Sequence, residues 1–421
     1  MLKILFSVGD LEKELNATTK IVVQLAEKLG SLGHSCMIAG ECSVYPQDEK
    51  TGNVVLKRLP SAKGIVKASE AFDDFFRKKA EDRNTARGTF VKRHPVHSIF
   101  LFLKYHPKYI QYQQKRYLRQ INQLVAEFKP DVVVAVCKPV LPFETVAMNV
   151  SGCPVYVYQV DPFGLHRIDN PEDKNGFIGR ETAVFERAEH IFTTPALLRQ
   201  YSEAEEYKNY TTKMTAVEFP NINKHIFAET VKPAIEFSGE YINLLFCGIV
   251  TDQFRSPAKL LKLLEPLFDK GERIRVYFLG DNMSATVTEY CLRYPENVIA
   301  KDRVPAETAL ATMNDADVLF NISNTLDNQV PSKIFDYFSM GKPVLNLQKI
   351  ENCPAEEYFA KYPLCYNLKE FEPADADSLL EFLKKAKGQQ MAFADVEKIY
   401  AEATVDYVAD VMEKAFAENI N

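Results

Sequence analysis

The stretch that most constrains the fold runs from residue 317 to residue 347. Residues 317–322 are a short apolar run bounded by polar residues, which is typical of a strand buried in a parallel sheet. A helix is expected to follow, because Pro331 suits a first helical position and apolar residues recur behind it at helical spacing. Gly341 ends this helix, and residues 343–347 resume a strand. The pattern therefore predicts one β–α–β unit of an α/β protein.

The same stretch predicts an anion-binding site at the start of its helix. The first backbone amides of a helix have no partner inside it, and a helix N-terminus attracts negative charge. The amides of Ser332, Lys333 and Ile334, with the charged Lys333 side chain, would suit a diphosphate. Asp336 is placed one turn further on to accept hydrogen bonds from a sugar hydroxyl. The alternative is that Asp336 only complements the helix dipole.

The order of a strand, a loop, Pro-Ser-Lys-Ile-Phe-Asp-Tyr (331–337) and Gly-Lys-Pro-Val (341–344) resembles the nucleotide-sugar signature of GT-B glycosyltransferases. It lies near the retaining family-4-type group of bacterial polysaccharide glycosyltransferases. This resemblance implies an α/β chain with two Rossmann-like domains whose parallel sheets face each other across a cleft.

In that group the helix carries a Glu-x7-Glu motif. The second acid, which holds the nucleotide ribose, corresponds to Asp336, and the first, which lies near the donor sugar, corresponds to Asn328. An amide can bond sugar hydroxyls, but it carries no charge to stabilise an oxocarbenium-like transition state. The sequence therefore leaves open whether the reaction is retaining or inverting.

Composition bounds the class of protein. With 421 residues the chain is too long for one ordinary core, and 46% hydrophobic with 26% charged residues is a globular balance. A net charge of −6 argues against nucleic-acid binding. The eight cysteines lack Cys-x-x-Cys spacing and are expected to be free thiols in a reducing cytoplasm. No signal peptide and no apolar run of about 20 residues is found, so a cytoplasmic location is expected.

The first domain is expected to span residues 1–222, with a linker at 223–240. Residues 2–39 predict a β-loop-α-β opening of the Rossmann-like kind. This opening lacks the G-x-G-x-x-G fingerprint, which disfavours a nicotinamide dehydrogenase. By the resemblance, the first loop contacts acceptor or donor, and its polar residues are candidates: Asp10, Glu12, Glu14 and Asn16.

A basic segment rich in aromatic residues, at about 77–119, interrupts the first domain. Its cations and apolar side chains would suit an anionic membrane surface, which would place the protein on the inner face of the membrane. The alternative is a helical insertion that packs on its own domain. The membrane hypothesis gains support if the acceptor is lipid-linked, as it is for many relatives.

Two predicted buried strands of this domain, 130–136 and 154–159, are followed by segments with polar residues. Ligands of open parallel sheets collect beyond the carboxyl ends of strands. Glu144 follows the first strand, and Asp161 and His166 follow the second. The resemblance implies a functional His or Asp at the tip of the second strand, which here is Asp161. An inverting enzyme would need one of these residues as general base, whereas a retaining enzyme would not. Alternatively, Asp161 and Pro162 only form a turn.

The second domain carries further candidates for donor binding. The resemblance implies an arginine just after Gly248 and a lysine a few residues on, both of which neutralise the donor diphosphate. Ile249 occupies the first position, and Arg255 is the nearby cation that could take the lysine's role. The nucleotide base is implied to lie against backbone near residues 302–304, which makes Val304 a candidate.

This second Rossmann-like domain is expected over residues 241–395, with a terminal helix at 396–421 that returns to the first domain. The expected function is transfer of a hexosyl group from a nucleotide-diphosphate sugar, a UDP-sugar above all, to a saccharide or lipid-linked acceptor in cell-surface polysaccharide or glycoconjugate synthesis. No cofactor or metal is expected, because the helix dipole and cations would neutralise the donor phosphates. Two alternatives remain: a non-catalytic GT-B-like partner subunit, which Asn328 and Ile249 favour, and a sugar-nucleotide hydrolase or epimerase of the same fold.

Overall fold

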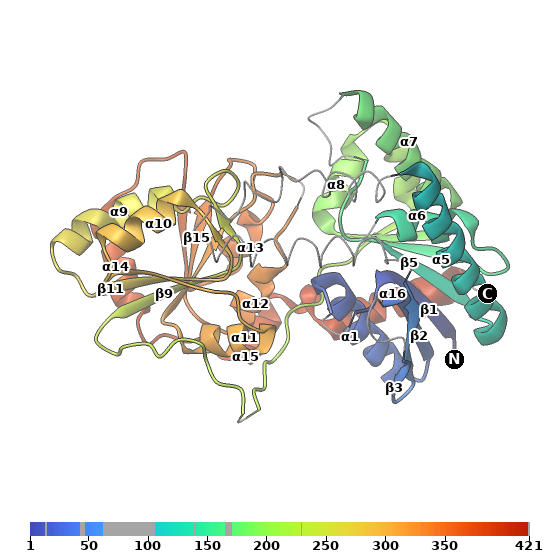
Figure 1. Cartoon of the computed structure of the whole chain (residues 1–421), viewed down its shortest axis with the longest axis horizontal. Helices are drawn as coiled ribbons and strands as arrows, with labels where there is room; N and C mark the ends of the chain where they lie inside the picture. Colours follow the sequence, from blue (N-terminus) through green and yellow to red (C-terminus); the bar gives the residue numbers. More distant parts are fainter. Residues whose placement is uncertain are drawn as a thin grey trace, which may run out of the picture. The chain divides into compact units, whose positions relative to one another are not determined.

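The computed structural model divides the chain into two compact units (Figure 1). Unit 1 comprises Met1–Val217 and Ala409–Asn421, and unit 2 comprises Glu218–Val408. The residues that the structure describes are 1–12, 15–42, 47–61, 106–137, 140–164, 171–228, 230–327 and 329–419.

This division differs from the expected boundary at residue 222. Residues 223–240 do not form a separate linker but belong to unit 2. There, the amide of Asn223 donates to Ser339 Oγ (3.2 Å), and the amide of Ala234 donates to Thr312 Oγ1 (2.9 Å). These bonds attach the segment to helices of unit 2, which its polar composition does not reveal.

The described part of unit 1 contains an eight-stranded sheet of order β3-β4-β2-β1-β5-β6-β7-β8, which is parallel except at β3. Strands such as β5 are buried along their whole length, because helices cover both faces of a parallel sheet. The chain order reverses between β1 and β5, which makes this the switch point of the sheet. The strands are β1 (Lys3–Asp10), β2 (Ser35–Cys42), β3 (Glu49–Thr51), β4 (Val54–Pro60), β5 (Val132–Cys137), β6 (Val155–Gln159), β7 (His190–Thr193) and β8 (Met214–Ala216).

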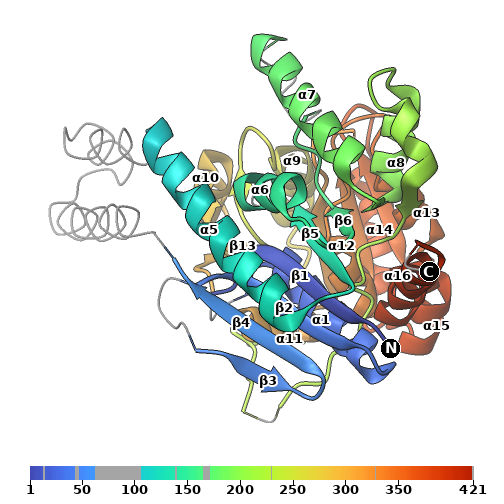
Figure 2. The ribbon, with the colours of Figure 1, turned by 90° about the vertical axis from the view of Figure 1, so that its right-hand side faces the viewer.

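Helices cover both faces of this sheet (Figure 2). On one face, α5, α6 and α7 share a core with the strands, and on the other the Phe416 ring of α16 lies 5.3 Å from the ring of Tyr156 in β6. The helices are α1 (Ala17–Ser31), α5 (Pro107–Phe128), α6 (Val140–Asn149), α7 (Pro171–Arg187), α8 (Pro195–Glu203) and α16 (Val405–Asn419).

The basic, aromatic segment expected at about 77–119 is described only from residue 106. That part belongs to α5, whose buried residues include Tyr117. The rest lies outside the described residues. No helix in the described ranges is long and apolar enough to cross a membrane.

The described part of unit 2 contains a six-stranded parallel sheet of order β13-β11-β9-β14-β15-β16. From β9 the chain adds strands first on one side and then, from β14, on the other, so the switch point lies between β9 and β14. The strands are β9 (Ile242–Cys247), β11 (Ile274–Leu279), β13 (Val298–Lys301), β14 (Val318–Ile322), β15 (Val344–Gln348) and β16 (Cys365–Lys369). Two short strands, β10 (Val250–Thr251) and β12 (Asn282–Met283), pair with each other in a separate two-stranded parallel sheet.

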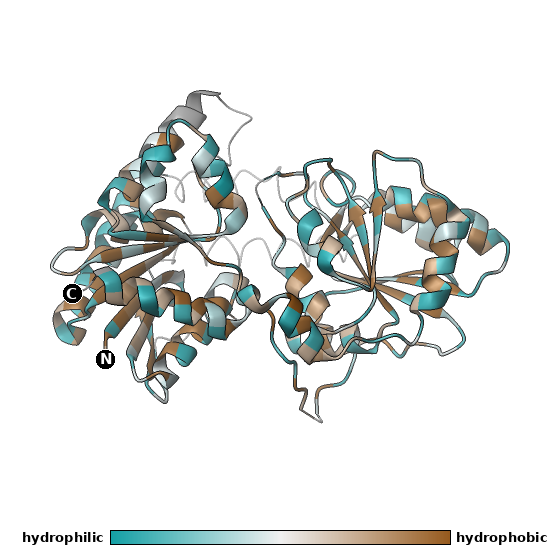
Figure 3. Ribbon diagram, turned by 180° about the vertical axis from the view of Figure 1, so that it is seen from behind, coloured by the Kyte–Doolittle hydropathy of each residue, from teal (hydrophilic) through white to brown (hydrophobic). Residues whose placement is uncertain are grey.

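The predicted β–α–β unit is confirmed as β14, α12 and β15, and Gly341 ends the helix at a positive φ of +67°. Hydrophobic residues dominate the strands (Figure 3), which agrees with the apolar runs from which they were predicted. The helices of unit 2 are α9 (Ala258–Asp269), α10 (Ala285–Arg293), α11 (Ala306–Asp315), α12 (Lys333–Ser339), α13 (Glu356–Lys361), α14 (Ala376–Ala386) and α15 (Phe393–Ile399).

The terminal helix expected at 396–421 is wrong as a single element. The structure has α15, a 3₁₀ turn at Ala401–Ala403, and then α16. The first helix ends at Ile399, with Tyr400 as its C-cap. The extended backbone of Thr404 ends the 3₁₀ turn, and its Oγ1 accepts the amide of Tyr407 (3.3 Å) to cap the second helix. The junction lies close to the start of the unit 1 portion at Ala409.

A buried acid at the start of unit 2 predicts a pH-dependent stability. Glu218 accepts a hydrogen bond from the Tyr358 hydroxyl, and burial raises its pKa from 4.5 to about 7. The folded protein thus holds a proton that the unfolded chain releases near pH 4.5, so this group lowers stability as pH rises towards 7. Glu218→Gln is expected to gain roughly 2–3 kcal/mol over the wild type at pH 8 and little at pH 4.5. Thermal unfolding of both proteins at the two pH values measures this, and an equal difference at both would refute it.

Candidate functional site

Two glycines follow the neighbouring strands β9 and β11, and the first of them lies at the switch point of unit 2. Gly248 follows β9 with φ +145°, and Gly280 follows β11 with φ +140°. A Cβ on Gly280 would lie 2.3 Å from the Gly248 carbonyl oxygen, and a Cβ on Gly248 would lie 2.9 Å from Lys333 Nζ. Only glycine therefore lets the backbone approach the lysine ammonium this closely.

Lys333 brings its ammonium to the end of β9. Its Nζ donates to the carbonyl of Cys247 (3.2 Å), which also accepts a hydrogen bond from the Tyr337 hydroxyl (3.4 Å). Desolvation lowers the pKa of Lys333. Cys247 and Asp336 act to raise this pKa, and the positive charges of Arg255 and Arg303 lower it further. Three cations thus share one neighbourhood among the described residues, and an added anion would relieve their repulsion.

Arg255 is held by a turn that points it towards β14. Its amide donates to Thr251 Oγ1 (3.3 Å), and its Nη2 lies 3.4 Å from Asn324 Oδ1, just beyond the end of β14. Asp252 fixes the same turn by accepting the Ser284 hydroxyl (2.5 Å) and the Ala285 amide (2.8 Å). The guanidinium is therefore directed to the switch point.

Arg303 is a residue that sequence reasoning missed. It is exposed in the loop that follows β13, next to the half-buried Val304. Arg303 lies near Lys333 because of the order of strands in the sheet. From the sequence alone, Arg303 is only a cation that follows a predicted strand. We refer to Lys333, Arg255 and Arg303 as the cation cluster.

The start of α12 differs from the prediction. The helix begins at Lys333 rather than Pro331 and spans seven residues, so its dipole is short. The amide of Ile334 donates to the Pro331 carbonyl (3.1 Å), so the expectation of three open amides is wrong for Ile334. The Ile334 amide is therefore used in a tight turn at residues 331–334 and does not point out of the helix start. Ser332 precedes the helix and Asp336 lies half-buried in its first turn, whereas Asn328 lies outside the described residues.

In unit 1, Glu144 does not occupy a loop as expected but lies in α6. Both of its carboxylate oxygens accept hydrogen bonds from Arg180, one of them at 2.8 Å from Nε. Arg180 also lies over the Phe177 ring, at 5.1 Å from its centroid. A carboxylate held on both oxygens by a guanidinium is a poor general base, so Glu144 is removed from the catalytic candidates.

Asp161 lies directly beyond β6, in the loop of residues 160–164. Its carbonyl accepts hydrogen bonds from Gln159 Nε2 (2.9 Å) and from Cys137 Sγ (3.4 Å). These bonds fix the backbone of the loop at the carboxyl edge of the sheet. His166, the other candidate after this strand, lies outside the described residues.

The structure describes three of the four first-loop candidates. Asn16 caps α1, because its Oδ1 accepts the amide of Thr19 (2.9 Å). Glu12 accepts a hydrogen bond from Cys42 Sγ (3.5 Å), and the Asp10 carbonyl accepts one from Thr19 Oγ1 (3.0 Å). Glu14 lies outside the described residues.

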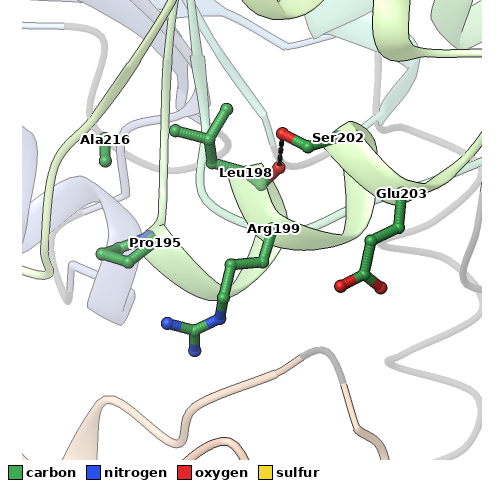
Figure 4. Close-up of a pocket in the computed structure, with 6 residues that line it drawn as sticks. All are labelled: Pro195, Leu198, Arg199, Ser202, Glu203 and Ala216. Atoms are coloured by element: carbon green, nitrogen blue, oxygen red, sulfur yellow. Dashed lines mark hydrogen bonds between the residues drawn. The ribbon is translucent and has the colours of Figure 1, made fainter.

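A shallow hollow of about 460 Å³ lies on α8 of unit 1 (Figure 4). Arg199 and Glu203 extend from α8 there, beside apolar Leu198. None of the predicted site residues lines it. No group of three or more His, Cys, Asp or Glu side chains suited to a metal ion occurs within the described ranges.

No protein-family model matches this sequence. No curated protein matches it either. Solved structures do match over nearly the whole chain. Sucrose-phosphate synthase from Thermosynechococcus elongatus is 11% identical with a TM-score of 0.61, and 99% of each chain is covered. The catalytic domain of starch synthase IV from Arabidopsis thaliana, bound to ADP and acarbose, is 8% identical with a TM-score of 0.57, covering 100% of this chain and 99% of that one. UDP-GlcNAc 2-epimerase from Methanocaldococcus jannaschii is 10% identical with a TM-score of 0.52, covering 99% of this chain and 100% of that one.

At these identities the likeness establishes the fold. The chain has the GT-B fold, with two Rossmann-like units, as the signature at residues 331–344 implied. Both transferases and an epimerase are among the structures it resembles, so the chemistry is argued from the site.

Proposed function

We propose that this chain is a glycosyltransferase that takes a hexosyl group from a nucleotide-diphosphate sugar. The observation that carries the proposal is the cation cluster beside Gly248, at the switch point of unit 2. Cations at this place would neutralise a diphosphate as it becomes the leaving group, which is the main electrostatic need of glycosyl transfer. The cluster takes over the role first expected of the α12 amides.

The other donor contacts follow from this placement. Asp336, one turn beyond Lys333, would accept hydrogen bonds from the ribose, and Val304 would lie near the base. Ser332 and Gly248 would border the phosphates. A UDP-sugar remains the donor we expect, without a metal or cofactor.

Unit 1 is assigned the acceptor, a saccharide or a lipid-linked sugar. Asp161 is the proposed catalytic residue of this unit, as general base towards the acceptor hydroxyl in an inverting reaction. Asn328 and His166 are retained as candidates near the donor sugar. The product would enter cell-surface polysaccharide or glycoconjugate synthesis, at the cytoplasmic face of the membrane.

An epimerase or hydrolase is the second candidate, because the fold is shared with UDP-GlcNAc 2-epimerase. Incubation with UDP- and GDP-sugars, with and without saccharide acceptors, separates the cases. Nucleotide release that requires an acceptor indicates transfer, and release with free sugar indicates hydrolysis. Sugar inversion at C2 indicates epimerisation. Absence of reaction with every donor and acceptor favours the partner-subunit alternative, for which Asn328 and Ile249 are the evidence, since both depart from the residues of the retaining group.

Asp161→Asn tests the catalytic role in unit 1. The amide keeps the size of the side chain and leaves the carbonyl bonds of the loop in place, but it cannot take a proton. Turnover is expected to fall about 10²- to 10³-fold, while the affinity for UDP stays unchanged. Initial rates and calorimetric titration measure the two quantities. Wild-type turnover in this variant would exclude Asp161 as the base.

A further inference from the structure

A buried carboxylate lies beneath the loop that carries Asp161. Glu181, in α7, has no exposed surface. Its two oxygens accept hydrogen bonds from five groups among the described residues: Gln159 Nε2 (2.8 Å), the Phe163 amide (2.9 Å), the Gly164 amide (3.1 Å), the Tyr201 hydroxyl (3.2 Å) and the Tyr207 hydroxyl (2.7 Å). Two of these donors are backbone amides of the loop itself.

The same loop is held at its other end by Gln159. The Nε2 of this side chain donates both to Glu181 and to the Asp161 carbonyl, so it links the carboxylate to the residue that we place in catalysis. The loop backbone is therefore fixed at residues 161, 163 and 164. The Phe163 ring adds edge contacts to Phe143 and Phe177, at centroid distances of 6.0 and 6.5 Å.

Gly164 shows how closely the loop approaches the carboxylate. A Cβ at this position would lie 2.5 Å from Glu181 Oε2 and 2.5 Å from the Tyr207 hydroxyl. Any larger residue would push the loop away from both. Because residue 164 is a glycine, its amide can approach the Glu181 carboxylate closely enough to donate a hydrogen bond.

Burial of a charged acid costs free energy, because the charge loses its hydration. Burial raises the pKa of Glu181, because the charged form is desolvated, and the bonds from Phe163, Tyr207 and Gly164 act in the opposite direction. An apolar side chain of similar size often stabilises a core as well as a buried charge does. An apolar side chain cannot, however, fix the direction of two amides and a bridging glutamine, which is what Glu181 does.

We infer that Glu181 is a positioning residue, which acts through the backbone of residues 161–164 to hold Asp161 in place for proton transfer. This inference rests on the proposed function. It adds a residue of the next helix, α7, to the residues that serve the acceptor side. A small displacement of a catalytic group costs rate rather than affinity for the donor.

Glu181→Gln is the first test. One end of the new amide presents N–H groups where the carboxylate accepted bonds, so the loop loses at least one of its anchors. The kcat is expected to fall about 10- to 100-fold. The UDP affinity is expected to stay unchanged, and the Phe163 and Gly164 amides to exchange faster with deuterium. Glu218→Gln, which alters a buried acid of unit 2, is the matched control and should leave kcat unchanged.

A double-mutant cycle separates positioning from a merely structural role. In the Asp161→Asn background, Glu181→Gln is expected to have no further effect on kcat, because the group that it positions is gone. Independent, multiplicative losses would overturn the inference, as would full kcat in Glu181→Gln alone. If Glu181→Gln does not fold, Gln159→Met replaces it in the cycle. This variant removes the bridging amide and keeps the size of the side chain, and the same effects on kcat are expected.

The inference and the proposed function fail differently. If the wild type turns over no sugar nucleotide, both fail together. If the wild type and Asp161→Asn behave as predicted while the Glu181 variants keep full kcat, only the positioning role falls. Thermal unfolding of each variant confirms that the compared proteins are folded.

Discussion

Replacing Lys333 with alanine is expected to weaken the binding of UDP about 100-fold and to reduce turnover at least as much. The ammonium is fixed on the Cys247 carbonyl at 3.2 Å, close to two arginines, so it meets a diphosphate without reorganisation. Loss of a charge-assisted bond to a phosphate accounts for an effect of this size. Calorimetric titration with UDP measures the affinity, and initial rates measure turnover.

The control for this prediction is another lysine of the same unit. Lys262 is exposed on α9, and Lys262→Ala removes the same charge from unit 2. It should leave UDP binding within about two-fold, because exposed charges at a distance are screened by salt. Equal losses in both variants would mean that only net charge matters, and the site at Lys333 would be abandoned.

Gly248→Ala is expected to lower both the stability of unit 2 and its affinity for UDP. A φ of +145° lies in a region that is almost confined to glycine, which costs about 1–3 kcal/mol for alanine. The new Cβ would lie 2.9 Å from Lys333 Nζ, and the flexible lysine would move away from the Cys247 carbonyl. The affinity should therefore fall at least 10-fold, beyond what the loss of stability explains.

Gly271→Ala provides the matched comparison. Gly271 also has a positive φ, +77°, but a Cβ there would meet no atom within 4 Å. This variant should lose stability and keep its affinity for UDP. If Gly248→Ala bound UDP as well as Gly271→Ala does, the close approach of residue 248 to Lys333 Nζ would not matter for UDP binding. Thermal unfolding and titration of the two variants settle the point.

Much of the fold could be predicted because its signals are local. The apolar run of β14 and the positive-φ Gly341 define one β–α–β unit without reference to the rest of the chain. The break at Thr404 was missed, because a side chain that caps the next helix competes with a continuous apolar pattern over residues 396–416. The division at residue 217 depends on contacts of the following segment, which composition does not show.

The candidate site was less accessible to sequence reasoning. Lys333 is the first residue of the helix that follows β14, and Arg255 lies in the loop between β10 and α9. The resemblance to GT-B enzymes singled out both residues. Arg303 and Glu181 carried no such signal, since one depends on the order of strands and the other on a loop folding over a helix. Glu144 lies in α6 rather than in a loop, and its bond to Arg180 could not be predicted, because Arg180 comes from a different helix, α7.

The most direct test of the account is a calorimetric titration of the wild-type protein with UDP, GDP and ADP. Diphosphate binding at the cation cluster of unit 2 is the claim on which the transferase proposal rests. The account predicts saturable binding of one nucleotide, UDP being expected, that is weakened about 100-fold in Lys333→Ala and unaffected in Lys262→Ala. Absence of binding for all three nucleotides would contradict it.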